Sequence, residues 1–398
     1  MDSSLNYTQA NFESIFQDVK NLVNVETGSY DMAQLKEGCD AVEALFRERI
    51  GDPDIFERYS ATGYGDTLAL TYEGALPGHV MLIGHYDTVW PLGTLDAWGE
   101  RASRSEDGRL KESGPGIFDM KTGLVQGIWS LKALKDRGIE HPTVTFLING
   151  DEERGSVSSR PMIEEKAKEV DAVLVLEPTL DGRVKVARKG VAIVAVDAIG
   201  IEAHAGLEPA KGASAITALM EYCLAATRLA DPAKETTINV GIVKGGSGSN
   251  VVAGHAHAVI DIRLKDPQEK DRLNEGFDAI TWSDERVRID TIRDWNRPPM
   301  VFNENSRVLL DVLKRSAQRM GRELGTAEVG GGSDANYVSA LNIPVICGLG
   351  AVGGGPHARH EFIYPEEIPF YTALVADSLL DVPLLPGREA EVLSEHVS

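Results

Sequence analysis

The sequence predicts an α/β protein in which a larger domain, residues 1–188 and 295–398, is interrupted by a smaller α+β domain, residues 189–294. Two observations support this division. Apolar runs alternate with helical periodicity before and after the interruption, as in βαβ units. Inside it, the expected elements follow the order β-α-β-β-α-β, which is the split arrangement of a ferredoxin-like module. A chain of 398 residues also exceeds one ordinary hydrophobic core, which favours two domains.

The first part of the larger domain contains three largely apolar runs of strand length, each followed by polar residues. They cover residues 80–84, 143–148 and 172–176, and a helical pattern covers 124–134. Strands that are buried on both faces of a sheet read as nearly continuous apolar runs. We therefore expect a mixed or parallel central sheet that is flanked by helices.

The smaller domain is expected to contain four strands and two helices. The strands are predicted at 191–199, 237–243, 259–264 and 287–291, and the helices at 213–229 and 268–280. An inserted domain needs both of its ends close together at surface linkers, and Gly190 and residues 297–299 fit these two hinges. The larger domain then resumes with a helix at 306–320, an apolar run at 343–346 and a closing helix at 369–380.

Composition excludes several classes of function. The formal net charge of −21 argues against a surface that binds nucleic acid or anionic membranes, since either needs clustered Lys and Arg. The three cysteines, Cys39, Cys223 and Cys347, form no CxxC pair, which suits a reducing compartment. The amino terminus has no basic region before an apolar stretch, and no apolar run reaches the length of a membrane span. We expect a cytoplasmic protein.

Two adjacent glutamates, Glu152 and Glu153, follow the apolar run 143–148. Neighbouring residues at the end of a strand point in different directions, so one carboxylate can bind a metal while the other faces a water on that metal. A solvated acidic turn is the alternative interpretation for such a pair taken alone. Three further segments argue against that alternative.

Each of these segments brings an imidazole or a carboxylate to the end of an apolar run or a Gly/Pro-rich turn. His85 ends the run 80–84, and Asp87 stands two positions later, where it can hold the second ring nitrogen of a metal-bound imidazole. Asp119 follows a Gly-Pro-Gly turn, and Glu177 ends the run 172–176. This is the layout expected at the carboxyl edge of an α/β sheet.

In this order, the motifs resemble those of the dinuclear zinc peptidases and deacylases. That family includes aminoacylase, succinyl-diaminopimelate desuccinylase, acetylornithine deacetylase, peptidase T and the glutamate carboxypeptidases called glucarpidase, whose branch is the most similar. The resemblance covers roughly residues 15–380. It rests on His85-x-Asp87, Gly-Pro-Gly-x-x-Asp119, Asp-Glu152-Glu153-Arg-Gly-Ser, Leu-Glu177-Pro-Thr, Ala-His204-Ala-Gly and Gly-Gly-Gly-Ser-Asp334.

The resemblance implies a catalytic domain that holds two zinc ions and an inserted lid domain that also forms a homodimer. His85 and Glu177 would hold one zinc and Glu153 and His357 the other, with Asp119 bridging both; Co²⁺ or Mn²⁺ could substitute. Glu152 would act as the general base and Asp87 would orient His85. For the last ligand, the segment after Gly353 offers both His357 and His360; the likeness favours His357.

The same likeness implies roles for residues of the smaller domain. His204 would donate to the scissile carbonyl, often from the partner subunit; a capping or core role is the alternative. Arg297 would grip the free carboxylate of the substrate, with Asn250 and Arg263 as secondary candidates.

His79, His141 and His396 are expected to be plain surface residues.

The predicted activity is metal-dependent hydrolysis of an amide bond that releases a C-terminal or N-acylated amino acid. The form of residues 186–190, Val-Ala-Arg-Lys-Gly, is common among the deacetylases and keeps an N-acyl amino acid deacylase or a di- or tripeptidase open as an alternative. An alternative from another class is a noncatalytic binding protein on the same fold, against which the presence of Glu152 argues.

Overall fold

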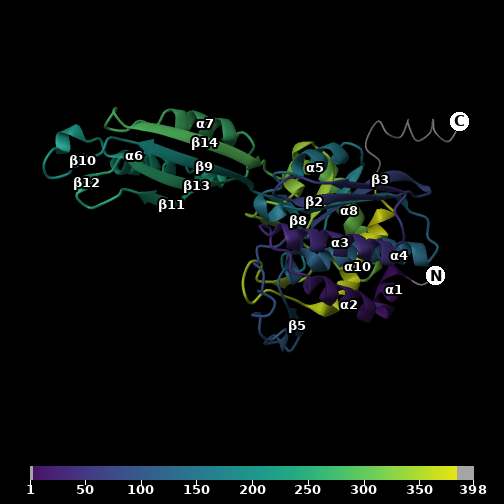
Figure 1. Cartoon of the computed structure of the whole chain (residues 1–398). Coiled ribbons are helices and arrows are strands. Elements are labelled where there is room, and N and C mark those ends of the chain that lie inside the picture. The colour runs from purple at the N-terminus through teal and green to yellow at the C-terminus, as the bar shows by residue number, and fades with distance from the viewer. Residues whose placement is uncertain (1–2, 383–398) are drawn as a thin grey trace. The chain divides into compact units, whose positions relative to one another are not determined.

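The chain divides into two compact units in the computed structural model, which describes residues 3–382 (Figure 1). The first unit comprises Met1–Ala187, Phe302–Glu328 and Ser333–Ser398. The second comprises Arg188–Val301 and Val329–Gly332.

The first unit is built on an eight-stranded sheet in the order β1-β2-β6-β3-β7-β16-β8-β15. Its four central strands, β6, β3, β7 and β16, are parallel to their neighbours in this group, while β2 and β8 pair with it antiparallel. The central sheet is thus mixed, as predicted. The strands are β1 (Ile55–Tyr59), β2 (Gly65–Tyr72), β3 (Leu76–His85), β6 (Pro142–Gly150), β7 (Ala172–Val175), β8 (Val184–Arg188), β15 (Thr326–Val329) and β16 (Val345–Cys347).

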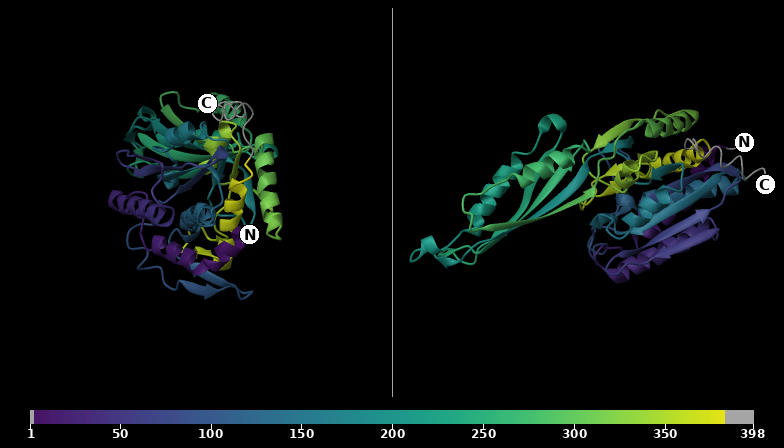
Figure 2. Two further views of the ribbon diagram at one scale, coloured as in Figure 1. Left: turned by 90° about the vertical axis from the view of Figure 1, so that its right-hand side faces the viewer. Right: turned by 90° about the horizontal axis from the view of Figure 1, so that it is seen from above.

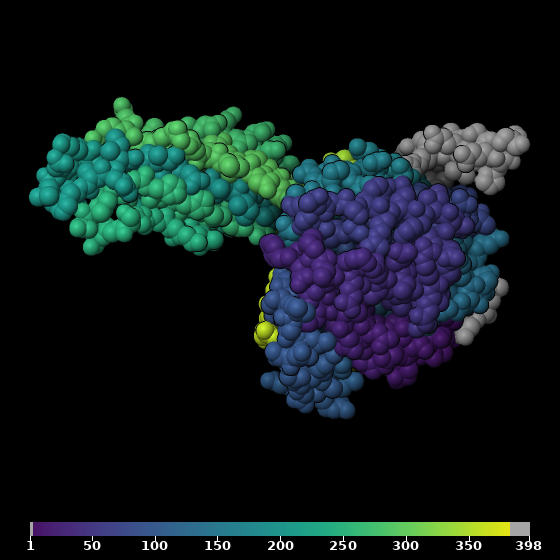
Figure 3. All heavy atoms as spheres, in the orientation of Figure 1, coloured from purple at the N-terminus to yellow at the C-terminus, as the bar shows by residue number. Residues whose placement is uncertain are grey.

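Helices cover this sheet and form most of the hydrophobic core with it. Alternate residues of β6, among them Phe146, pack against the amino-terminal helices, and the Phe146 ring lies edge-to-face 4.8 Å from Phe46 of α3. The amino-terminal helices form much of the surface of the first unit that faces the viewer in Figure 3. The helices of this unit are α1 (Ser4–Ala10), α2 (Phe12–Val23), α3 (Met32–Arg49), α4 (Thr122–Asp136), α5 (Arg160–Ala167), α8 (Glu304–Arg319), α9 (Ala335–Ala340) and α10 (Ile368–Leu379).

A small second sheet in the first unit joins two segments that are far apart in sequence. Its order is β17 (Gly353–Gly354), β18 (Phe362–Ile363), β5 (Leu110–Ser113) and β4 (Ala102–Arg104). The pairing of β18 with β5 brings the loop after Ser113 next to the loop between Gly354 and Phe362. These are the two loops in which the sequence predicts Asp119 and His357.

The second unit has the predicted β-α-β-β-α-β order and an antiparallel sheet, β11-β13-β9-β14. Alternate residues of β9 that point to one face, such as Val194 and Val196, are fully buried, and both helices lie on that side (Figures 1 and 2). The elements are β9 (Gly190–Ile199), β10 (Ala203–His204), α6 (Ala215–Thr227), β11 (Thr237–Gly245), β12 (Val251–Val252), β13 (His255–Leu264), α7 (Glu269–Asp278) and β14 (Arg288–Arg297).

The second unit extends beyond the predicted range 189–294. β14 continues to Arg297, and β13 begins at His255, four residues before its predicted start. The extension of β13 is hidden because its first core residues, such as Ala256, are small, and that of β14 because its register shifts between Asp294 and Arg297. Val329–Gly332 also belongs to this unit, since the buried guanidinium of Arg188 donates to the carbonyls of Gly331 and Gly332 at 3.0 Å.

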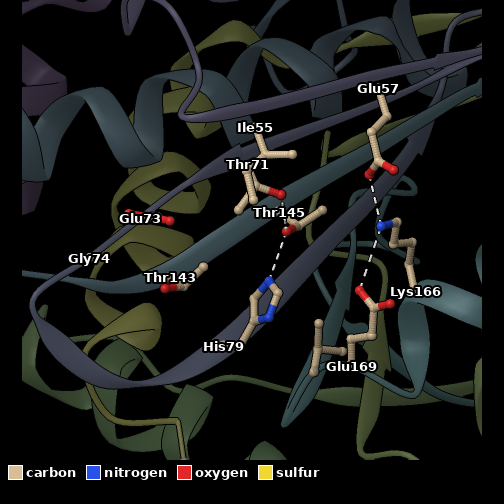
Figure 4. A pocket seen from close by; sticks show the side chains of 11 residues that line it. Ile55, Glu57, Thr71, Glu73, Gly74, His79, Thr143, Thr145, Lys166 and Glu169 are labelled. Atoms are coloured by element: carbon tan, nitrogen blue, oxygen red, sulfur yellow. Dashed lines mark hydrogen bonds and ion pairs between the residues drawn. The ribbon is translucent and has the colours of Figure 1, made fainter. Parts of the chain in front are cut away.

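A polar pocket of about 280 Å³ lies on the outer part of the main sheet (Figure 4). There the ring Nε2 of His79 is 2.7 Å from the hydroxyl of Thr145, which is 2.7 Å from the hydroxyl of Thr71. His79 is half-buried and His141 is buried, so the expectation that both are plain surface residues was wrong. The ring of His79 is held by the Thr145 hydroxyl, and Nδ1 of His141 lies 2.7 Å from the carbonyl of Pro142. His396 lies outside the described residues.

None of the helices between residues 3 and 382 combines the length and the apolar character that crossing a bilayer requires.

The contact between α4 and the end of β7 generates a prediction. A Cβ on Gly123, in the first turn of α4, would lie 2.0 Å from the backbone oxygen of Leu176. Backbone atoms cannot yield as a flexible side chain can, so we expect Gly123→Ala to destabilise the first unit by about 1–3 kcal/mol and to lower its Tm. Gly330→Ala, where an added Cβ meets no atom within 4 Å, is the matched control. An unchanged Tm in Gly123→Ala would contradict this packing.

Candidate metal centre

The candidate site lies at the carboxyl edge of the parallel strands. β3 ends at His85, β7 leads into Glu177, and β6 leads into a short 3₁₀ turn, Glu152–Arg154. Parallel strands end at the same edge of a sheet, and open α/β sheets bind ligands there. Asp119 and His357 reach this edge from the two loops that the small sheet joins.

The carboxylate of Asp119 lies between two imidazoles. Its Oδ1 is 3.3 Å from Nε2 of His85, and its Oδ2 is 3.4 Å from Nε2 of His357. A second carboxylate lies near the same nitrogen of each ring: Glu177 Oε1 is 3.9 Å from His85 Nε2, and Glu153 Oε2 is 3.1 Å from His357 Nε2. One carboxylate oxygen for each imidazole is the arrangement that a bridging ligand needs.

These side chains form two groups that could each hold a metal ion. His85, Asp119 and Glu177 make the first, and Asp119, Glu153 and His357 the second; within each, the ligand atoms lie within 4.8 Å of one another. The donors also fit a cation, because the buried atoms His85 Nε2 and Asp119 Oδ1 have no hydrogen-bond partner in the described chain. Imidazole nitrogen and carboxylate oxygen are ligands that zinc accepts.

Asp87 is fully buried and connects His85 to the turn that carries the two glutamates. Its Oδ1 lies 3.3 Å from Nδ1 of His85 and accepts the backbone N–H of Glu152 at 3.2 Å. Its Oδ2 accepts the backbone N–H of Glu153 at 3.2 Å and the hydroxyl of Ser29 at 2.8 Å. Nδ1 of His85 is also 3.0 Å from the Asp87 carbonyl, so this nitrogen is occupied and Nε2 faces the cluster.

Burial and charge act in opposite directions on the pKa values of the site. Burial raises the pKa of Glu153 to about 8, although the hydrogen bond with His357 works against that rise. Hydrogen bonds to Asp119 and Glu153 raise the pKa of His357 to about 11. Burial alone would raise the pKa of Asp119, but the neighbouring imidazoles of His357 and His85 outweigh it and hold that pKa below its ordinary value. The carboxylates therefore need nearby positive charge to stay ionised.

Glu361 is a supporting residue that the sequence analysis did not single out. Its buried Oε1 accepts the backbone N–H groups of Phe118 and Asp119 at 2.8 and 3.0 Å, and its Oε2 accepts those of Gly116 and the Trp90 indole, both at 3.1 Å. Burial raises its pKa to about 7, while the backbone N–H groups oppose the rise. Glu361 lies four residues after His357, so its hydrogen bonds connect the loop of His357 to the loop of Asp119. The four-residue spacing from His357 is the feature of the sequence that could have identified Glu361.

Asp334 supports the glutamate turn in a similar way. Its buried carboxylate accepts from the side-chain amide of Asn149 at 2.6 Å and from the hydroxyl of Ser156. The hydroxyl of Tyr337, one turn later in α9, donates to the carbonyl of Gly155 at 2.9 Å. The sequence offered Asp334 only as part of a Gly-rich motif, because the partners lie about 180 residues away.

Of the two candidate histidines, His357 lies in the cluster and His360 is in neither ligand group. The backbone of His357 has a φ of 61°, a left-handed conformation that is uncommon for residues other than glycine. Strand β17 and the Gly355–Pro356 turn that follows it carry this ring to Asp119.

The predicted residues of the second unit occupy two places in it. His204 and Asn250 are neighbours at the β10–β12 ribbon, where the backbone N–H of Ala205 donates to the Asn250 carbonyl at 2.9 Å. Arg263 and Arg297 flank Val191 on adjacent strands. The roles of these four residues toward the cluster of the first unit stay predictions.

Comparisons with known proteins agree with this geometry. A model of peptidase family M20/M25/M40 matches residues 81–381. Carboxypeptidase G2 of Pseudomonas sp. (strain RS-16) is 30% identical over 383 residues, which cover 93% of this chain and 89% of that protein. Succinyl-diaminopimelate desuccinylase of Dechloromonas aromatica (strain RCB) is 27% identical over 312 residues, covering 73% and 80%.

Among solved structures, aminopeptidase PepT from Bacillus cereus ATCC 10987 has a TM-score of 0.75 and 26% sequence identity. The match covers 93% of this chain and 98% of that chain, so it includes both units.

The hydrogen bonds that the Glu361 carboxylate accepts lead to a prediction for zinc binding. Each of its oxygens accepts two N–H donors, so in Glu361→Gln the amide NH₂ would face two donors and leave them unsatisfied. We expect the affinity for zinc to fall roughly 10–100-fold, as when the support of a metal ligand is lost. Competition with a chromophoric chelator measures it.

Glu366→Gln is the matched control, because this exposed carboxylate pairs with Arg109 and contacts no ligand loop. It should leave zinc affinity unchanged. Equal zinc affinity in Glu361→Gln and Glu366→Gln would show that Glu361 does not hold the Asp119 loop.

Proposed function

Because this chain belongs to peptidase family M20/M25/M40 and is a metal-dependent hydrolase, we propose that it cleaves an amide bond to release a C-terminal or N-acylated amino acid. The observation that carries this proposal is the carboxylate of Asp119 between the imidazoles of His85 and His357. Two ligand groups that share one carboxylate fit a dinuclear centre.

We propose that His85 and Glu177 hold one zinc ion and Glu153 and His357 the other, with Asp119 bridging. When bound, two such ions supply an activated water and Lewis acidity toward the scissile carbonyl. The support for zinc is the mixture of imidazole and carboxylate ligands, which Co²⁺ or Mn²⁺ could also accept.

Glu152 is the proposed general base. Its side chain is buried beside the ligand Glu153, and Asp87 fixes its backbone N–H. A carboxylate at this position can take a proton from the attacking water and return it to the leaving amine. Glu152 is in neither ligand group.

His204 is the proposed donor to the oxygen of the scissile carbonyl. Its Nδ1 accepts the backbone N–H groups of Gly206 and Leu207, both at 3.1 Å. In the neutral ring, the proton must therefore be on Nε2, which makes Nε2 a hydrogen-bond donor. A donor aimed at the oxygen that becomes negative stabilises the tetrahedral transition state.

The proposed substrate has a free carboxylate, which Arg297 would grip with help from Asn250. Arg297 is buried at the end of β14, so its guanidinium orientation is restricted. Arg263 is a weaker candidate, since its guanidinium already forms two hydrogen bonds, of 2.9 and 2.8 Å, with Asp261. Similarity to a desuccinylase as well as to a carboxypeptidase keeps N-acyl amino acid deacylation as the second candidate.

We also propose a two-fold homodimer formed by the second unit. β11 is an edge strand, and its Ile242 and Val243 are 47% and 58% exposed. Met220 and Leu224 of α6, the helix that packs on β11 and β13, are 51% and 61% exposed. An unpaired strand edge beside an apolar helix face suits pairing with a second copy.

The base assignment predicts that Glu152→Ala binds zinc like the wild type but has a kcat lower by several orders of magnitude, roughly 10³-fold or more, because only proton transfer is lost. Zinc analysis and kinetics on N-acyl amino acids measure both. Glu153→Ala is the matched variant and should lose zinc. Loss of zinc in Glu152→Ala instead would mean that the two glutamates exchange roles.

Chelation should abolish wild-type activity and added zinc should restore it; full activity without metal would refute the mechanism.

The dimer predicts complementation between two inactive variants. If His204 completes the site of the partner subunit, mixing Glu152→Ala with His204→Ala chains should restore activity up to one working site per mixed dimer. Activity after subunit exchange is compared with that of each variant alone. Sedimentation as a monomer, or no recovery after proven exchange, would contradict action across the dimer.

A further inference from the structure

Arg154 immediately follows the two site glutamates and is held in one orientation by aromatic rings. Its guanidinium carbon lies 4.7 Å from the ring centroid of Tyr30 and 4.1 Å from that of Tyr64. One guanidinium nitrogen donates to the carbonyl of Gly63 at 2.5 Å. Two cation–π contacts and one hydrogen bond fix the planar group.

The charge of Arg154 is not balanced by a carboxylate. Within residues 3–382, its contacts are Gly63 and the two tyrosine rings, and it forms no ion pair. Arg160, six residues later, also lies over a tyrosine ring, at 4.9 Å from Tyr337, but pairs with Glu164 at 2.7 Å.

The three segments that build this feature all end at the edge of the sheet that carries the metal ligands. Tyr64 precedes Gly65, which pairs with Gly150 at the carboxyl end of β6. Tyr30 follows Ser29, whose hydroxyl is bonded to Asp87. Tyr30 is 82% exposed, so one ring face of the cluster is open to a ligand.

We propose that Arg154, together with Tyr30, forms a subsite for a second carboxylate of the substrate, besides the carboxylate that Arg297 would grip. The inference rests on the proposed function and names a substrate class, amides with two acidic groups. A guanidinium presents paired N–H donors that match a carboxylate, and because the rings already fix it, little conformational entropy is lost on binding.

The second carboxylate can belong to the acyl group or to the released amino acid, and two isosteric substrate pairs distinguish these sources. N-succinyl-alanine and N-succinamoyl-alanine differ only in the charge of the acyl group. N-acetyl-glutamate and N-acetyl-glutamine differ only in the charge of the released residue. Dissociation constants are measured by calorimetry on the zinc-loaded Glu152→Gln variant, which binds without turnover.

The acidic member of one pair should bind about 10-fold more tightly than the neutral member, as expected for a charge-assisted hydrogen bond. Adding Arg154→Gln should remove this preference and leave the affinity for the neutral member unchanged. Arg154→Lys should restore part of the preference. Arg160→Gln changes the net charge equally and removes a similar stacked arginine, so it should keep the preference.

The proposal is overturned if neither pair shows a preference, if no compound binds, or if Arg154→Gln weakens both members equally. Failure of the proposed function has a different signature. In that case, the zinc-loaded enzyme with Glu152 intact hydrolyses none of the four compounds, whatever their binding preference.

Discussion

The molecule is organised around the concentration of negative charge at one buried edge of a sheet. Asp87, Glu152, Glu177 and Glu153 are almost completely shielded from solvent, and Asp119 lies between them. Burial raises the pKa of Glu153 to about 8, because a carboxylate that is removed from water is less stable in its ionised form. Two imidazoles offset part of this negative charge. Cations held by the same oxygens would offset the rest, which would couple metal binding to the stability of this edge.

Carboxylates outside the ligand groups make the arrangement rigid. Asp87 ties His85 to the glutamate turn, Glu361 ties the Asp119 loop to the segment after His357, and Asp334 braces the same turn from α9. Each accepts several hydrogen bonds from groups distant in sequence. Ligand side chains that hydrogen bonds already hold in place lose little conformational entropy when a cation binds. The arrangement of these ligands therefore tolerates only small displacements.

The sequence predicted those parts of the site that a local pattern encodes. His85, Glu153 and Glu177 each follow an apolar strand, so their convergence follows from the rule for parallel sheets. Glu361 and Arg154 escaped notice because their importance depends on contacts made across the fold. The lengths of β13 and β14 were underestimated for another reason: the first core residues of β13 are small alanines, and the register of β14 shifts between Asp294 and Arg297.

The proposed dinuclear centre depends most on Asp119 as a ligand shared by two metal ions. Anomalous X-ray diffraction at the zinc absorption edge, on crystals of the zinc-loaded protein, tests this directly. We predict two peaks on either side of the Asp119 carboxylate, one bonded to His85 and Glu177 and the other to Glu153 and His357. A single peak, or a second peak that does not contact Asp119, would contradict a dinuclear centre.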